Sequence, residues 1–473
     1  MVPAEQGGGL MHAGLFAEEI TGLDEALSAV DGFDEALTDG LLRPRPETAA
    51  RVTGLAHAVA GTPLAARTAE AAERTAAGAA DEDHLVTLAA ARTALLGSVH
   101  DALAERAAEA LGRPRAEAPA PRPGERRQTP NLLAAARAWL RDLALLGWRG
   151  IDHEAVSASA QVVSAMLGEP GLRRQASLLD GFAGELAASC PGSSLDRVPA
   201  RRWADLWTRA MLLTVPGAAD TPAEGTATGR LLPLGVDLHE YATGAQAQVH
   251  AVFEPADGSA PRLVRAAVSV PKPDSVVGAG VWQLLRPHMS LLTAVGEGRS
   301  MELTGMPVTA EGDLLWDDAH ASAGGTADPF VTARVALPAA TDQVTAPLDR
   351  HPARIALPVF LEGYTAQAGE EGTEFTVAGH TLPVDTGRVP VAGPLTPQAV
   401  GTSCACVGLL RWDAGSFFVQ PLAVERTVRG KTVALHAGGW AAGTTDKAGA
   451  KAEKAATDAV AVLRERAGRL LRT

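Results

Sequence analysis

The sequence predicts a multidomain α+β protein, with helical segments first, β-rich segments next and one helix at the end. Apolar residues recur at helical spacings up to about residue 215, whereas short apolar runs bounded by Pro, Gly or Asp prevail after residue 230. Two aperiodic stretches, residues 112–130 and 216–229, interrupt the chain. At 473 residues, the chain is long enough for about two to four domains.

A helical domain is expected over residues 10–111. Its clearest apolar stripe has spacings of three, four and seven, which place its members on one helical face: Leu85, Leu88, Leu95, Val99 and Leu103. Residues 112–130 alternate Pro, Arg, Ala and Glu, a composition that disfavours a helix. That stretch is therefore predicted to be a linker.

A second helical domain is expected over residues 131–215, and Leu132–Trp148 and Trp203–Leu213 are its strongest helices. Trp203 and Trp207 are four residues apart and share a helical face, so we expect them to pack helix against helix. Residues 216–229, rich in Gly, Ala, Thr and Pro, are predicted to be a second linker.

A β-rich domain with one internal helix is predicted over residues 230–345, and a second β-rich domain or a continuation of the first over residues 346–440. Four segments resemble strands: Val249–Phe253, Leu263–Val270, Val331–Leu337 and Ile355–Leu361. The internal helix is expected at roughly Val281–Val295. Short strands separated by turn signals favour a small barrel or a sandwich.

The clearest hairpin runs from Val407 to Val424, because Asp413-Ala414-Gly415 places a turn signal between two apolar runs. Val428–His436 is expected to add a strand. The chain then returns to a helix in residues 446–473, where Ala, Lys, Arg and Glu surround a few apolar residues.

The net charge of −13 argues against nucleic acid as a partner, because binding phosphate backbones requires a concentrated basic surface. Three cysteines are too few for a disulfide framework, which favours a reducing compartment. The first residues do not resemble a secretory signal, and no segment reaches the ~20 apolar residues of a membrane helix. We therefore expect a cytoplasmic protein with no membrane contact.

Gly430-Lys431-Thr432 is similar to the end of a phosphate-binding loop. Such a loop requires a glycine where this sequence has Glu425, and it must lead into a helix, whereas both flanks here resemble strands. A charged hairpin turn is the preferred interpretation, and no cofactor is predicted.

Three residues in the β-rich region are candidate catalytic groups. Asp385-Thr386-Gly387 is similar to the active-site loop of aspartic proteases, but it occurs once and is followed by Arg388 where a small residue is expected. Asp318 and His320 could converge on one face of an extended chain for acid–base chemistry. A β-turn at Asp385 and a solvated loop at Asp318 and His320 are the alternatives.

Cys404 and Cys406 are candidate metal ligands, since two closely spaced thiolates can bind one cation. A zinc site needs about four ligands, and no second cysteine pair follows. Free cysteines packed on a strand are the alternative.

The helical region of residues 132–213 resembles the helical stretch beyond the zinc module of bacterial SWIM-finger proteins. Its matching motifs are Ala136-Arg137-Ala138-Trp139-Leu140-Arg141-Asp142-Leu143 and Arg202-Trp203-Ala204-Asp205-Leu206-Trp207. The finger's Cys-x-Cys and later Cys-x-His are absent there, since the Cys-x-Cys at Cys404 and Cys406 comes after the helices. SWIM-finger proteins are commonly encoded beside MoxR-type AAA+ ATPases and von Willebrand A-domain proteins. The resemblance therefore implies an accessory role beside such a partner.

The sequence thus favours a non-enzymatic scaffold or adaptor that makes protein–protein contacts. Two alternatives remain. One is a hydrolase-like enzyme with a scattered site in the β-rich region, formed from Asp318, His320 and Asp385. The other is a β-barrel that binds a small molecule or nucleic acid, and the acidic charge argues against nucleic acid.

Overall fold

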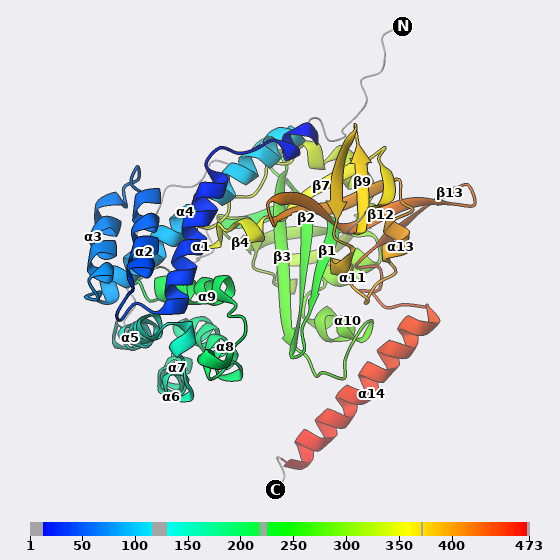
Figure 1. The fold of residues 1–473 in the computed structure, drawn as a ribbon. Helices are drawn as coiled ribbons and strands as arrows, with labels where there is room; N and C mark the ends of the chain where they lie inside the picture. The colour runs from blue at the N-terminus through cyan, green and yellow to red at the C-terminus, as the bar shows by residue number, and fades with distance from the viewer. Residues whose placement is uncertain (1–12, 116–129, 217, 219–224, 370–371, 471–473) are drawn as a thin grey trace.

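The computed structural model describes residues 13–115, 130–216, 218, 225–369 and 372–470 (Figure 1). Helices make up the N-terminal part, two β-sheets follow, and one long helix ends the described chain. The predicted α+β class is therefore confirmed. No helix within these ranges is long and apolar enough to span a membrane.

The N-terminal part contains nine α-helices in the described ranges: α1 (Leu23–Asp39), α2 (Pro46–Ala58), α3 (Ala65–Ala76), α4 (Glu82–Leu111), α5 (Pro130–Leu146), α6 (His153–Ser157), α7 (Ser159–Leu167), α8 (Arg173–Ala188) and α9 (Ala200–Leu213). Short 3-10 turns lie between or before them: η1 (Ala13–Ala17), η2 (Trp148–Gly150), η3 (Pro170–Leu172) and η4 (Gly192–Ser194).

The helices before and after the predicted linker at 112–130 share one hydrophobic core. Trp203 and Trp207 are buried in it, and the Trp207 indole donates a hydrogen bond to the Leu140 carbonyl (2.8 Å). This confirms that both tryptophans pack helix against helix. In the same core, Arg92 of α4 donates two hydrogen bonds to Asp34 of α1 (2.6 and 2.8 Å).

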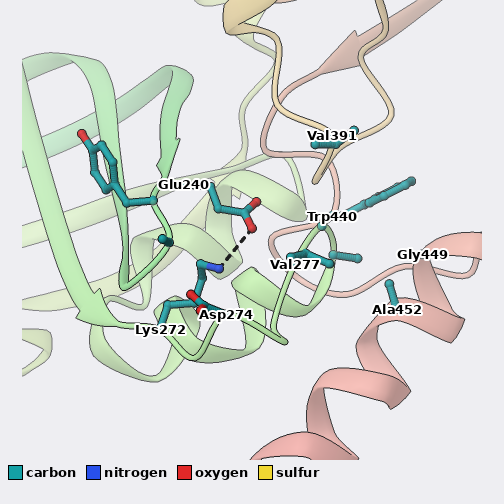
Figure 2. A pocket seen from close by; sticks show the side chains of 12 residues that line it. Glu240, Lys272, Asp274, Val277, Val391, Trp440, Gly449 and Ala452 are labelled. Atoms are coloured by element: carbon teal, nitrogen blue, oxygen red, sulfur yellow. Dashed lines mark ion pairs between the residues drawn. The ribbon is translucent and has the colours of Figure 1, made fainter. Parts of the chain in front are cut away.

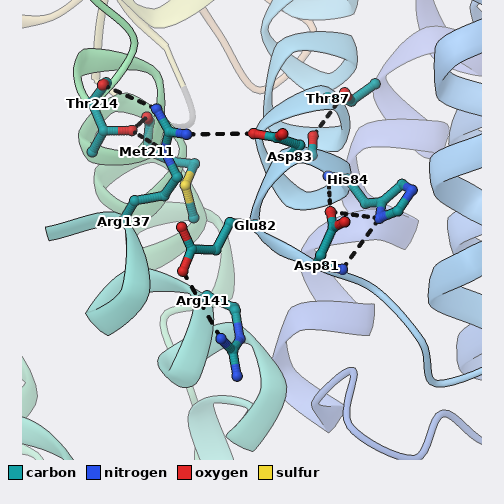
Figure 3. Close-up of polar contacts among 9 residues, drawn as sticks. All are labelled: Asp81, Glu82, Asp83, His84, Thr87, Arg137, Arg141, Met211 and Thr214. Atoms are coloured by element: carbon teal, nitrogen blue, oxygen red, sulfur yellow. Dashed lines mark hydrogen bonds and ion pairs between the residues drawn. The ribbon is translucent and has the colours of Figure 1, made fainter. Parts of the chain in front are cut away.

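Helix α4 begins at a capping box (Figure 3). The Asp81 carboxylate accepts a hydrogen bond from the His84 backbone N–H (3.0 Å), and His84 Nδ1 accepts one from the Asp81 N–H (3.2 Å). The predicted apolar stripe is buried along its whole length. Its first part lies in the helical core, whereas Val99 and Leu103 lie in the core of the second sheet, so α4 ties the two parts together.

The first sheet has six strands: β1 (Gly225–Glu240), β2 (Gly244–Pro255), β3 (Arg262–Pro271), β4 (Arg299–Val308), β5 (Asp313–Leu314) and β6 (Ala321–Thr326). β1 pairs with β2 on one side and with β4 on the other, so the order β1-β2-β3-β5-β4 returns to β1. Among the pairings of these five strands, only that of β3 with β5 is parallel. Apolar side chains such as Leu231, Val249 and Met301 fill the core, and Trp282 joins them.

The second sheet has seven strands: β7 (Leu357–Glu362), β8 (Thr365–Gly369), β9 (Gly372–Val377), β10 (His380–Val384), β11 (Ala405–Asp413), β12 (Ser416–Val428) and β13 (Lys431–His436). Their order is β7-β11-β12-β10-β9-β8, with β13 also paired to β12. The β11–β12 hairpin turns at Ala414 and Gly415, both with positive φ (47° and 86°), as a two-residue hairpin turn requires.

The predicted hairpin at Val407–Val424 is therefore confirmed. The next turn, at Arg429 and Gly430, also has positive φ (51° and 77°) and joins β12 to β13. Gly430-Lys431-Thr432 thus belongs to a hairpin, as expected, and not to a phosphate-binding loop that leads into a helix.

The two sheets meet where β1 crosses β11 and β12. Gly235 of β1 has no side chain there, and a Cβ at this position would lie 2.7 Å from Leu422 Cβ. Beside it, Asp237 of β1 accepts hydrogen bonds from Arg411 and Gln420 of the second sheet, both at 2.7 Å. All three polar side chains are buried, so the contact is specific as well as close.

The strand predicted at Val331–Leu337 is wrong. The structure has a helix there, α12 (Pro329–Val335), followed by the 3-10 turn η7 (Leu337–Ala339). Asp328 Oδ1 caps α12 by accepting hydrogen bonds from the N–H groups of Phe330 (2.7 Å) and Val331 (3.1 Å), and Pro329 stands at its first position. The capping carboxylate and the proline favour a helix here more strongly than the β-branched residues favour a strand.

The helix expected at Val281–Val295 is interrupted. It consists of α10 (Gly280–Leu285), the 3-10 turn η5 (Arg286–His288) and α11 (Leu291–Gly296). Pro287 lies in the interruption, and proline removes the backbone donor that a continuous helix needs. Five other short elements lie in the β-rich region: η6 (Asp318–His320), η8 (Pro347–Asp349), η9 (Pro352–Arg354), η10 (Thr386–Arg388) and α13 (Pro397–Val400).

Both predicted linkers are too long. Gly225–Gly229 already belongs to β1 and pairs with β4, and residues 217 and 219–224 lie outside the described residues. At the other linker, Arg113 is buried and ion-paired with Asp342 (3.0 Å), and Pro130 begins α5. Residues 116–129 lie outside the described residues. The division into separate helical domains stays a prediction.

The C-terminal helix α14 (Lys447–Leu470) agrees with the predicted one. Asp446 caps it by accepting a hydrogen bond from the Gly449 N–H (3.0 Å). The helix packs across α10 near its beginning and then projects away from the rest of the protein (Figure 1).

Candidate functional site

A surface cavity of about 840 Å³ lies between α14 and the first sheet, and we call it the α14 groove (Figure 2). Four parts of the chain line it: the β1–β2 turn, the loop from β3 to α10, the loop carrying Val391, and the segment from Trp440 to α14. Its volume lies in the range of sites that hold a small molecule or a few side chains of a partner.

The strand ends on one side of the groove are held by backbone hydrogen bonds. The Tyr241 N–H donates to the Gly244 carbonyl (2.8 Å), which closes the β1–β2 turn, and the Lys272 N–H donates to the Thr243 carbonyl (2.9 Å). Tyr241 also stacks on His239, with 6.2 Å between the ring centroids and 7° between the planes. These contacts fix the turn beside the groove.

Lys272 is the buried charge of the groove. Its side chain is 2% exposed, and its ammonium donates a hydrogen bond to the Val276 carbonyl (2.8 Å). Nζ also lies 3.4 Å from Glu240 Oε1 (Figure 2), and Asp274 lines the same cavity. The bond from the ammonium to the Val276 carbonyl holds the β3–α10 loop in place. The carboxylates of Glu240, which pairs with Lys272, and Asp274 lie at the groove wall.

Most of the remaining wall is apolar. Three large side chains at the groove are solvent-exposed: Tyr241 (58%), Val277 (57%) and Val391 (85%). Trp440 and Ala452 complete the wall from the side of α14 (Figure 2). Several exposed apolar side chains around one cavity are typical of a surface that another molecule covers.

Helix α14 is tied to the body beside the groove by α10. Gly280 of α10 packs directly against Ala456 of α14, and a side chain at Gly280 would collide with the Ala456 methyl group. Gln283 Oε1 accepts a hydrogen bond from the Thr457 hydroxyl (2.9 Å), and Arg286 pairs with Glu453 (3.7 Å). These contacts hold the wall that α14 contributes, at Gly449 and Ala452, against the body.

The loop carrying Val391 is anchored by a buried tryptophan. The Trp282 indole donates a hydrogen bond to the Ala392 carbonyl (2.5 Å), and Trp282 itself is fully buried. Val391, one residue earlier, is thus held at the groove mouth with most of its surface exposed. The arrangement is suited to holding an apolar side chain between the two walls, with carboxylates at one end.

The candidate catalytic residues Asp318 and His320 both lie in η6, which is a helical turn and not the expected extended chain. Asp318 Oδ1 accepts hydrogen bonds from the Ser290 N–H (3.0 Å) and the Trp316 indole (2.6 Å). Burial alone would raise the pKa of Asp318, but these hydrogen bonds outweigh it and lower the pKa. The carboxylate is therefore stabilised in its ionised form.

His320 has a different partner, since its Nδ1 lies 2.8 Å from the Thr304 carbonyl oxygen. Asp385 belongs to the second sheet, where its carboxylate accepts hydrogen bonds from the Gly387 N–H and from Arg388 Nε, both at 2.9 Å. Asp318 and His320 thus share the turn η6 but have separate hydrogen-bond partners, and Asp385 caps the turn η10 in the second sheet. Their catalytic role stays a prediction.

The two cysteines of the candidate metal site differ in environment. Cys404 is exposed, and its thiol donates to the Glu425 carbonyl (3.4 Å), whereas Cys406 is fully buried in the second sheet. Burial raises the pKa of the Cys406 thiol, which disfavours the thiolate that a metal needs. Among the residues that the structure describes, no three His, Cys, Asp or Glu side chains are grouped so that they could hold a metal ion.

Sequence reasoning missed the residues of the α14 groove. Lys272 carried a weak signal, because it is one of only five lysines and stands between two prolines at the end of a predicted strand. Tyr241 and Val391 carried none, since isolated apolar residues in turns are common in any sequence.

Comparison with known proteins adds no relative: no protein-family model matches the chain, and neither a curated protein nor a solved structure shows significant similarity to it.

Proposed function

We propose that this protein is a non-enzymatic adaptor that holds an apolar segment of a partner protein in the α14 groove. The observation that carries the proposal is the cluster of exposed apolar side chains at the groove: Tyr241, Val277 and Val391. Covering such side chains removes apolar surface from water, which is the main driving force of protein association.

Helix α14 supplies a second contact surface. Its side chains contact the body at Glu453, Ala456 and Thr457, and farther along Val462 is 45% exposed. Three of the five lysines of the chain lie in α14, at Lys447, Lys451 and Lys454, although the whole chain carries a net charge of −13. A partner with an acidic surface beside an apolar segment would complement both features.

The partner class comes from the resemblance of residues 132–213 to the helical region of SWIM-finger proteins. It implies a MoxR-type AAA+ ATPase or a von Willebrand A-domain protein. In this proposal the adaptor uses the helical core as a rigid support and presents the groove and α14 to that partner.

The test is binding between purified proteins. The full chain is mixed with a MoxR-type ATPase and with a von Willebrand A-domain protein of the same organism, and complexes are measured by size-exclusion chromatography with light scattering. Val391→Glu places a charge in the apolar contact and should weaken binding at least about tenfold. Val335→Glu is the matched control, because Val335 is 74% exposed on α12 and does not line the groove.

Two outcomes contradict the proposal. Equal binding by the Val391→Glu and Val335→Glu variants would exclude the groove as the contact surface. A chain that stays monomeric with both candidate partners would exclude the partner class.

A small-molecule-binding β-barrel is the second candidate, and the strand order of the first sheet, which returns to β1, favours it. Leu231, Val249 and Met301 are buried in its core, so a ligand would have to bind at the ends of the strands. The α14 groove lies at such an end. The hydrolase alternative rests only on Asp318, His320 and Asp385.

A further inference from the structure

A second cavity, of about 500 Å³, lies where the helical part meets the β-rich part, and we call it the arginine cleft. Its walls come from α4, from α9 and from the segment Leu348–Arg354, which carries η8 and η9. Six arginines line it: Arg92, Arg201, Arg202, Arg209, Arg350 and Arg354. His351 adds an imidazole, and Asp205 is the only carboxylate among the described residues of the lining.

Helical spacing places three of the charged groups of the lining on one face of α9. Arg201, Asp205 and Arg209 are spaced by four residues on α9, so they lie on one face of the helix. The opposite wall is held in place from both sides: Arg209 donates a hydrogen bond to the Leu348 carbonyl (3.0 Å), and Arg350 Nε donates to the Thr345 carbonyl (3.0 Å). The cleft is therefore built from rigid elements and not from loose surface chains.

Two carboxylates around the cleft are each shared between two cations, whereas Asp31, Glu185 and Asp101 each pair with one arginine of the lining. One oxygen of Asp349 accepts from both Arg209 (2.9 Å) and Arg354 (2.5 Å). One oxygen of Asp205 lies 2.7 Å from Arg92 Nη2 and 3.5 Å from His351 Nε2. A guanidinium has several N–H donors, so sharing an acceptor leaves donors for a further anion.

Three polar side-chain atoms at the cleft have no hydrogen-bond partner among the described residues. They are the hydroxyl of Thr208, a residue only 3% exposed, and His351 Nε2 and Asp205 Oδ1, which lie 3.5 Å apart as an ion pair. All three residues line the cavity. A buried hydroxyl without a partner costs free energy, and a ligand oxygen in the cleft would supply the missing acceptor or donor.

Charges of both signs act on Arg354. Burial lowers its pKa, the carboxylates of Asp349 and Asp205 oppose this effect, and the guanidiniums of Arg209 and Arg174 lower the pKa further. A guanidinium that is repelled by its neighbours gains from an added negative charge.

We infer that the arginine cleft binds a phosphate-bearing small molecule. Arginine forks match the geometry of phosphate oxygens. The guanidiniums of Arg201, Arg202 and Arg354 are about half-exposed (53, 64 and 52%) and pair with Asp31, Glu185 and Asp349, so a phosphate would share their remaining N–H donors with these carboxylates. Leu96, Leu206 and Leu212 form an apolar wall beside them, which suits an organic group attached to the phosphate. The cavity volume is within the range of small-molecule sites.

The position of the cleft gives such a ligand a structural effect. It would contact α9 of the helical part and the segment Leu348–Arg354 of the β-rich part at the same time. A ligand that binds only the folded state stabilises it, so the two parts would be held together more tightly when it is bound. This site is separate from the α14 groove and does not depend on the adaptor function.

The probe is inorganic pyrophosphate, titrated into the full-length chain by isothermal calorimetry in a buffer without phosphate or sulfate. Binding with an upward shift of the melting temperature is expected. Arg202→Gln and Arg354→Gln should each weaken binding about tenfold, because each removes a charge-assisted hydrogen bond. Arg45→Gln is the matched control, since Arg45 is 67% exposed, pairs with Asp39 and lies outside the cleft.

Far-UV circular dichroism verifies that each variant keeps its helices. The inference is overturned if pyrophosphate does not bind the full-length chain at millimolar concentration. It is also overturned if Arg202→Gln and Arg354→Gln bind as tightly as Arg45→Gln, because the anion would then be held by other surface charges.

Discussion

At the scale of single residues, buried polar groups decide how the two sheets meet. Asp237 receives hydrogen bonds from Arg411 and Gln420, and His239 Nε2 lies 3.0 Å from the same carboxylate. Burial would raise the pKa of Asp237, but the hydrogen bonds and charges of these partners outweigh it and hold the pKa well below its usual range. The carboxylate is thus ionised inside the interface, and its partners make the contact between sheets specific.

His250 of β2 lies close to this cluster and makes stability depend on pH. It is fully buried, its Nε2 has no partner among the described residues, and burial lowers its pKa to about 3. Attraction by Asp237 opposes the shift, and Arg265 and Arg411 add to it. The unfolded chain therefore takes up a proton near its ordinary pKa of about 6.5, whereas the folded protein does not.

The neutral His250 ring therefore does not lower the free energy of unfolding above about pH 6.5. As the pH falls below that value, protonation of the unfolded chain lowers the free energy of unfolding by about 1.4 kcal/mol per pH unit. We expect His250→Leu to remove this part of the slope of the unfolding free energy between about pH 6 and 4. Urea unfolding at several pH values measures it. Equal slopes in the two proteins would show that His250 is not buried as a neutral ring.

At the scale of elements, start signals decide where helices form. Asp328 followed by Pro329 starts α12 in a segment whose valines favour a strand, and Asp81 with His84 starts α4. The backbone N–H of His84 lowers the pKa of Asp81, so the capping carboxylate is ionised at neutral pH. Such caps satisfy donors that the first helical turn leaves without partners.

Asp81→Ala should lower the free energy of unfolding by about 1 kcal/mol, because it removes the acceptor that caps the 30-residue helix α4. Asp83→Ala is the matched control in the same turn. Asp83 is 87% exposed and reaches Arg137 only at 3.4 Å (Figure 3), so its loss should cost less than about 0.5 kcal/mol. Equal losses in urea unfolding would argue against the capping box.

At the scale of the whole molecule, α4 joins the helical and β-rich parts. Leu85 and Leu88 belong to the helical core, and Val99, Leu103 and Ala107 belong to the core of the second sheet. Arg113, just after α4, donates a hydrogen bond to the Pro358 carbonyl of β7 (2.5 Å). Since one helix contributes to both cores, neither part can lose its packing without exposing apolar surface of the other.

Leu103→Ala tests this coupling. Leu103 is 1% exposed, so the substitution should lower the free energy of unfolding by about 2–5 kcal/mol. Circular dichroism of the helices and tryptophan fluorescence should still report one shared transition in urea. Leu42→Ala, at a leucine that is 53% exposed, is the control and should have little effect. Two separate transitions would show that the parts unfold independently.

Local patterns determined much of the fold. Helical spacing identified the buried stripe of α4 and the packing of Trp203 and Trp207, and Ala414-Gly415 identified the β11–β12 turn. Such features depend on residues close in the chain, and the sequence displays them directly. The errors at Val331–Leu337 and Val281–Val295 arose where a cap or a proline outweighed the apolar pattern.

The sequence by itself determined the general order of helices first, sheets next and one helix last, the hairpin turns at Ala414-Gly415 and Arg429-Gly430, and the lack of a complete phosphate-binding loop. Only the tertiary structure decided that the two helical segments share one core, that β1 also pairs with β4, and that distant residues line the α14 groove and the arginine cleft. The physical reason is that periodicity shows which face of an element is buried, but not which distant element covers it. Arg92, Arg202 and Arg354 meet only because three elements pack together around them.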